Sequence, residues 1–101
     1  LLPTVMQYNA KATGTKYRDI AIAMGVKGVE KMTQAQYRKA ACDAVQQLSI
    51  DVGIPANLKG VLKKEDIDFL ADSAVADACC PGNPREVTKA DVVKLYKSLM
   101  K

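Results

Sequence analysis

Apolar residues recur along this chain at helical spacing, and glycine, proline or a capping residue bounds each run. The longest run begins after Thr33, which is followed by glutamine three residues later, and it ends at Gly53. A threonine with glutamine at the third position after it is the capping-box signature of a helix start. Glycine commonly follows the last helical residue. The spacing predicts a helix with one buried face, made of Tyr37, Ala41, Ala44, Val45, Leu48 and Val52.

Two shorter helices are predicted before this one. Pro3 suits the first turn of a helix that ends near Asn9, because a first-turn residue needs no free N–H. Thr15 is expected to cap a second helix that stops at Gly25. The following residues, as far as Met32, are predicted to be a connector. The buried positions of the second helix are expected to be Tyr17, Ile20, Ala21 and Met24.

Two more helices are predicted after Gly53. One begins at residues 63–66, where Glu65 and Asp66 suit the positive end of the helix dipole, and Thr88 with Asp91 caps the last. Their buried faces are expected to be Ile67, Leu70, Ala71, Ala74, Val75 and Ala78 in the first, and Val92, Leu95, Tyr96 and Leu99 in the second. No segment alternates with the period of a half-buried strand. Residues 1–101 are therefore predicted to form a single all-α (sub)domain, a bundle of about five helices.

Composition narrows the classes of partner. The chain is 49% hydrophobic and 26% charged, which is ordinary for a folded globular domain. Its 15 basic residues give a net charge of +4 but are scattered, so we expect no nucleic-acid partner. No apolar run approaches the ~20 residues of a membrane span, so we expect no membrane partner. Three cysteines leave at least one thiol unpaired, which favours a reduced, cytoplasmic protein.

The chain lacks several arrangements of residues on which enzyme chemistry commonly depends. It has no histidine, which excludes imidazole bases and a Cys-His or Ser-His nucleophile. No pair of cysteines has zinc-ligand spacing. The neighbouring carboxylates Glu65, Asp66 and Asp68 are explained by a helix start. These absences make a stand-alone enzyme hard to support.

A loop at residues 79–85 (CCPGNPR) holds the remaining polar and thiol groups, because its two prolines interrupt a helix. Cys79 and Cys80 are either a redox pair or thiols of which one packs under the loop as a small hydrophobe. Arg85 is either a carboxylate- or phosphate-binding group or one half of a salt bridge.

The predicted helix faces are rich in alanine, which permits close helix approach but supplies little apolar area. A neighbouring chain or domain would supply the missing contacts. One hypothesis is therefore a stand-alone helical protein–protein interaction module, self-associating as a homo-oligomer or binding a partner helix.

Five segments in order resemble the iron-dependent (group III) alcohol dehydrogenases. They are residues 1–9 (LLPTVMQYN), 17–25 (YRDIAIAMG), 51–58 (DVGIPANL), 64–71 (KEDIDFLA) and 78–88 (ACCPGNPREVT). The last segment resembles the family's C-x-x-x-N-P-R loop. Within the family, the branch of lactaldehyde reductases and 1,2-propanediol oxidoreductases is the most similar.

The resemblance implies a fold, a function and one site residue. Family members join an NAD(P)-binding α/β domain to an all-helical domain that holds Fe(II) through one Asp and three His, in a dehydroquinate synthase-like fold. They interconvert alcohols and aldehydes by hydride transfer. Their metal ligands precede the segment that residues 1–9 resemble, so this chain would be the C-terminal fragment of a longer two-domain enzyme and catalytically incomplete alone. Its partners would be the N-terminal remainder, which carries Fe(II) and NAD(H), and a small alcohol or aldehyde. Cys79 would line the substrate pocket, and the chain would carry no catalytic, cofactor-binding or metal-binding residue.

Overall fold

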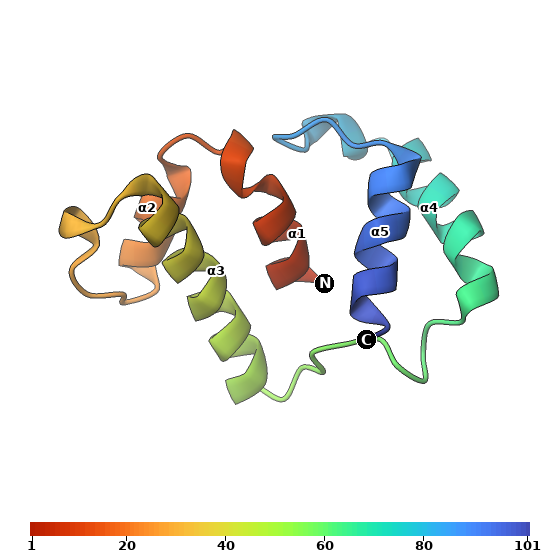
Figure 1. The fold of residues 1–101 in the computed structure, drawn as a ribbon, viewed down its shortest axis with the longest axis horizontal. Helices are drawn as coiled ribbons and strands as arrows, with labels where there is room; N and C mark the ends of the chain where they lie inside the picture. Colours follow the sequence, from red (N-terminus) through yellow and green to blue (C-terminus); the bar gives the residue numbers. More distant parts are fainter. The chain divides into compact units, whose positions relative to one another are not determined.

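The computed structural model describes all 101 residues and contains five α-helices and no strand (Figure 1). The helices are α1 (Leu2–Asn9), α2 (Lys16–Ala23), α3 (Gln34–Asp51), α4 (Ile67–Ala76) and α5 (Lys89–Leu99). Four single 3₁₀ turns join them: η1 (Ala10–Ala12), η2 (Val29–Lys31), η3 (Lys64–Asp66) and η4 (Cys80–Gly82). The predicted all-α fold of about five helices is confirmed. No helix is long and apolar enough to cross a membrane.

The chain divides into two compact units, which are described separately. Unit 1 is Leu1–Pro55 and contains α1, α2 and α3. Unit 2 is Ala56–Lys101 and contains α4 and α5.

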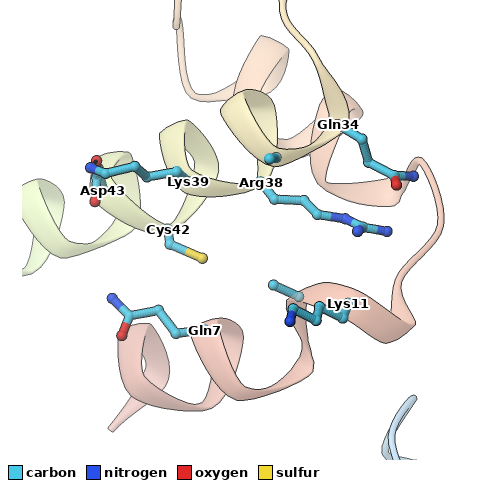
Figure 2. A pocket seen from close by; sticks show the side chains of 9 residues that line it. Gln7, Lys11, Gln34, Arg38, Lys39, Cys42 and Asp43 are labelled. Atoms are coloured by element: carbon cyan, nitrogen blue, oxygen red, sulfur yellow. Dashed lines mark hydrogen bonds and ion pairs between the residues drawn. The ribbon is translucent and has the colours of Figure 1, made fainter.

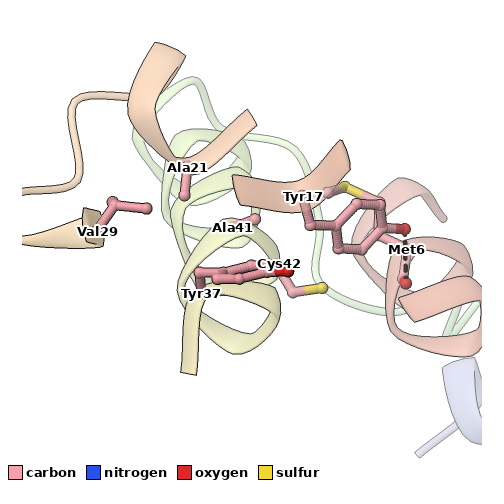
Figure 3. Packing of buried hydrophobic residues seen from close by; sticks show 7 residues of the cluster. All are labelled: Met6, Tyr17, Ala21, Val29, Tyr37, Ala41 and Cys42. Carbon is pink, nitrogen blue, oxygen red and sulfur yellow. Dashed lines mark hydrogen bonds between the residues drawn. The ribbon is translucent and has the colours of Figure 1, made fainter. Parts of the chain in front are cut away.

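The core of unit 1 forms where α1 and α2 pack on α3 (Figure 3). Ala21 of α2 and Ala41 of α3 are both fully buried, and these two small side chains allow the helices to approach closely. The Tyr17 hydroxyl donates a 2.8 Å hydrogen bond to the Met6 carbonyl, which ties α2 to α1. The cluster consists of Met6, Tyr17, Ala21, Val29, Tyr37, Ala41 and Cys42.

Two predicted caps are confirmed, and one is wrong. The Thr33 and Thr88 side chains each accept from a backbone N–H three residues later, and the reciprocal bond of the capping box is present in both. Thr15 precedes α2, but its side chain makes no capping hydrogen bond. The reason is its backbone: φ is −98° and ψ is 4°, whereas a capping residue needs the extended conformation found at Thr33.

The predicted buried face of α3 is right in its first half and wrong in its last turns. Tyr37 and Ala41 are buried, but Leu48 and Val52 are 48% and 63% exposed. The helices packed on α3 are each 8 residues long, whereas α3 has 18, so they leave its C-terminal end uncovered. The helix does end before Gly53, whose φ of 80° is the left-handed conformation expected of a stop.

The segment predicted as a connector contributes a core residue. Val29 lies in η2 and is 1% exposed, the most completely buried large side chain of the chain. Cys42 is also buried, at 3%, although it lies beside the predicted apolar face of α3.

Unit 2 is a pair of packed helices, α4 and α5. Ile67 and Ala71 are buried on α4, and Val92 and Leu99 on α5, as predicted. The Leu58 N–H donates to the Leu99 carbonyl at 2.7 Å and holds the incoming segment against the end of α5.

The predicted α4 face is wrong at Val75 and Ala78. The helix is shorter than expected and ends at Ala76, so Ala78 lies in a turn and is exposed. Val75 lies within the helix but is 37% exposed, whereas Ala74 is half-buried. The Lys89 ammonium, from the first residue of α5, lies 2.9 Å from Asp68 and from Asp72 of α4.

Candidate functional site

The predicted Cys-Pro-Gly-Asn-Pro loop is a shaped turn between α4 and α5. The Asp77 side chain accepts from the Cys79 N–H at 2.7 Å, and the Asp77 carbonyl accepts from the Cys80 N–H at 3.0 Å. The Asn83 side-chain amide donates to the Arg85 carbonyl at 2.6 Å. These short-range bonds hold the backbone on both sides of η4, so the loop presents its side chains in a defined arrangement.

The two loop cysteines have different surroundings. Cys79 is exposed and Cys80 is half-buried, and neither is in a disulfide. Neither thiol has a basic residue within three positions in the sequence to activate it as a nucleophile. An exposed thiol that no basic residue activates can define the size and polarity of a surface that it lines.

The chain's own residues do not form an iron site. There is no histidine, and no three side chains of the metal-binding types lie together in the structure. Iron needs several such ligands converging on one point.

A pocket of about 610 Å³ lies within unit 1, between α1 with η1 on one side and α3 on the other (Figure 2). The sequence did not predict it, because its two walls lie some thirty residues apart and neither carries a motif. Figure 2 shows Arg38 extending from α3 on the side opposite Lys11, with the Gln7 amide and the Cys42 thiol also facing the space. The lining residues are Gln7, Ala10, Lys11, Gln34, Ala35, Arg38, Lys39, Cys42 and Asp43.

Two weakly acidic groups near this pocket, the Cys42 thiol and the Tyr17 phenol, are harder to deprotonate than usual. Burial, and secondarily the Asp43 charge, raises the pKa of the Cys42 thiol. Burial also raises the pKa of the Tyr17 phenol; the neighbouring Cys42 acts in the same direction, and Arg38 opposes them. Cys42 is therefore a protonated packing residue at neutral pH and not a nucleophile.

Comparison with known proteins gives one consistent match. The model of the Fe-containing alcohol dehydrogenase family, C-terminal, matches residues 1–100. The lactaldehyde reductase of Escherichia coli (strain K12) is 57% identical over 97 residues, which cover 95% of this chain and 25% of that protein. The 1,3-propanediol dehydrogenase of Klebsiella pneumoniae is 31% identical over 98 residues, covering 96% of this chain and 25% of its own length.

The fold agrees with that match. The crystal structure of a 1,3-propanediol oxidoreductase superposes with a TM-score of 0.90 at 29% identity, covering 97% of this chain and 26% of that one. The chain thus spans about a quarter of the length of the curated relatives that it matches.

Proposed function

This chain belongs to the Fe-containing alcohol dehydrogenase family, whose C-terminal part it matches, and from that premise we propose that it is the C-terminal helical part of a longer two-domain enzyme. The proposed enzyme interconverts a small alcohol and its aldehyde, with Fe(II) and NAD(H) as cofactors held by the N-terminal remainder. The observation that carries the proposal is the 57% identity to a lactaldehyde reductase along 95% of the chain. The comparisons give no support to a stand-alone interaction module.

In this proposal the chain's helices support a site built by other residues. Unit 1 is held by a compact core, and unit 2 positions the loop between α4 and α5. The absence of histidine is consistent with a part of the enzyme that carries no metal ligand. The three free thiols support a reducing, cytoplasmic location.

Cys79 is proposed to line the substrate pocket of the whole enzyme. Its sequence position before the Asn-Pro-Arg segment supports this role, as do its exposed thiol and the hydrogen bond from its N–H to Asp77. A small uncharged side chain there would limit the size of the substrate.

The first test compares the chain alone with the protein encoded by the gene that contains it. We expect the longer protein, loaded with Fe(II), to oxidise NADH when lactaldehyde is added, and the isolated 101-residue chain to show no turnover. Activity of the isolated chain, or none with any small aldehyde in the longer protein, would overturn the proposal.

The second test addresses Cys79 in the longer protein. The Cys79→Ala variant should shift the ratio of kcat/KM for a longer aldehyde over lactaldehyde by about tenfold toward the longer one, because a smaller side chain leaves room for one more methylene. The matched control is Cys80→Ala, which removes the neighbouring thiol. An unchanged ratio in Cys79→Ala, or the same shift in both variants, rejects the role of Cys79.

A further inference from the structure

The pocket between α1, η1 and α3 has an excess of positive charge. Three basic side chains line it, Lys11 from η1 and Arg38 and Lys39 from α3, against the single carboxylate of Asp43. Lys39 forms an ion pair with Asp43, one helical turn away. Neither Lys11 nor Arg38 has an acidic partner in the chain. Two positive charges on opposite walls are therefore uncompensated.

A hydrogen bond holds the Arg38 guanidinium in place, but some of its N–H donors have no partner within the chain. Its Nη2 donates to the Gly14 carbonyl at 2.9 Å, and this same oxygen accepts from Gln34 and Tyr37. Its Nε is buried and has no hydrogen-bond partner within the chain. Because this Nε is closed off from solvent, an acceptor in the pocket cannot reach it. The Nη1 group also makes no hydrogen bond within the chain, so it remains as a donor for an acceptor in the pocket.

The chemistry of the acceptor follows from the charges and from the size of the pocket. Two uncompensated cations favour a doubly charged anion, and a phosphate monoester carries about −1.5 to −2 at pH 7. A volume of about 610 Å³ exceeds what a bare phosphate would fill, and uncharged side chains (Ala10, Ala35 and Cys42) line part of it. The Gln7 amide faces the same space and can donate or accept a hydrogen bond (Figure 2).

We propose that this pocket binds a small phosphorylated metabolite, with its phosphate between Arg38 and Lys11 and its uncharged body against Ala10, Ala35 and Cys42. The site lies wholly within unit 1. It does not depend on the dehydrogenase activity proposed above, and its test reads binding and not turnover.

The test is a titration of the ¹⁵N-labelled 101-residue chain with glycerol 3-phosphate, followed by NMR. We expect saturable shifts of the amides near Gln7, Lys11 and Arg38, with a dissociation constant on the order of 1 mM at low salt, and weaker binding as the salt concentration rises. Glycerol should cause no shifts, and inorganic phosphate should bind several-fold more weakly. Shifts that do not saturate, or equal affinity for inorganic phosphate, overturn the proposal.

Charge-removing variants locate the site. Lys11→Gln should weaken binding by about tenfold, since it removes one charge-assisted hydrogen bond. Lys27→Gln is the matched control, because it removes the same charge from an exposed position that does not line the pocket. Arg38→Gln should weaken binding further, but it also removes the bond to Gly14, so Lys11→Gln is the decisive variant. Equal affinity in the Lys11→Gln and Lys27→Gln chains would show that the pocket is not the site.

Discussion

Tyr17 joins two helices through one polar atom. Tyr17 is 6% exposed in the unit 1 core, and its hydroxyl donates a hydrogen bond to the carbonyl of Met6, a buried residue of α1. An aromatic residue with a polar tip fits this position because the ring supplies apolar contact while the hydroxyl pairs a carbonyl. Sequence spacing alone predicted that Tyr17 is buried; the acceptor, eleven residues earlier, could not be identified from local signals.

Removing that hydroxyl should destabilise unit 1. We expect Tyr17→Phe to lower the free energy of unfolding by about 1 kcal/mol, because the Met6 carbonyl would lose its partner while staying buried. Urea denaturation followed by circular dichroism measures this change. The control is Tyr96→Phe on α5, whose hydroxyl makes no hydrogen bond to the chain in the structure. Equal effects of the two substitutions would contradict the assigned role.

The buried acids of unit 1 predict alkaline sensitivity. The pKa values of Cys42 and Tyr17 are raised from their ordinary values of 9.0 and 10.0. Above about pH 9 the unfolded chain releases protons that the folded chain keeps, so stability is intact below this pH and falls as pH rises. Urea midpoints between pH 8 and 10.5 should show this decline. Cys42→Ala should flatten its first part, whereas Cys79→Ala, at an exposed position, should leave it unchanged. An equally steep decline in the Cys42→Ala chain would count against this explanation.

Local capping interactions determine where α3 and α5 begin, whereas neighbouring helices determine which of their residues are buried. Thr33 and Thr88 start α3 and α5 through capping boxes that involve only four consecutive residues each. Such signals are visible in sequence because all the interacting groups are local. Burial is not local. Leu48 is on the predicted face of α3, yet it is exposed because no element of unit 1 extends along that part of the helix.

Replacing Thr33 or Thr15 by alanine should have different effects on the folding free energy. Thr33→Ala should cost about 1 kcal/mol of folding free energy, because it removes the bond from the Gln36 N–H. Thr15→Ala should cost much less, because the Thr15 side chain caps nothing. Thermal or urea unfolding of the two variants measures the difference. Similar losses for both would show that the capping bond does not stabilise α3.

At the scale of the molecule, the chain consists of two units with separate sets of buried residues. All seven residues of the hydrophobic core cluster belong to unit 1. The buried residues of unit 2 lie on α4 and α5 and are few: Ile67, Ala71, Val92 and Leu99. A small core makes each apolar contact a large share of the stability, so unit 2 should be sensitive to truncation in its core.

Shortening the Leu99 side chain should therefore destabilise unit 2. Leu99→Ala should cost about 3 kcal/mol, since Leu99 is 6% exposed and its removal leaves a cavity. Amide hydrogen exchange should show loss of protection along α4 and α5, with protection in the unit 1 cluster retained. Val61→Ala, at an 82% exposed position of the same unit, is the matched control and should leave exchange unchanged. Retained protection in α5 of the Leu99→Ala chain would rule out this account of the core.

The sequence alone was enough to recognise the all-α class, the helix starts at Thr33 and Thr88 and the stop before Gly53, because caps, turns and apolar spacing act over a few residues. It was also enough to recognise the family, from five short segments in order. Tertiary structure decided which parts of each face are covered: it exposed Leu48 and buried Val29. It also placed Lys11 and Arg38, two residues with no shared motif, on opposite walls of one pocket. These outcomes depend on contacts between residues far apart in the chain, and local spacing carries no information about where a neighbouring helix ends.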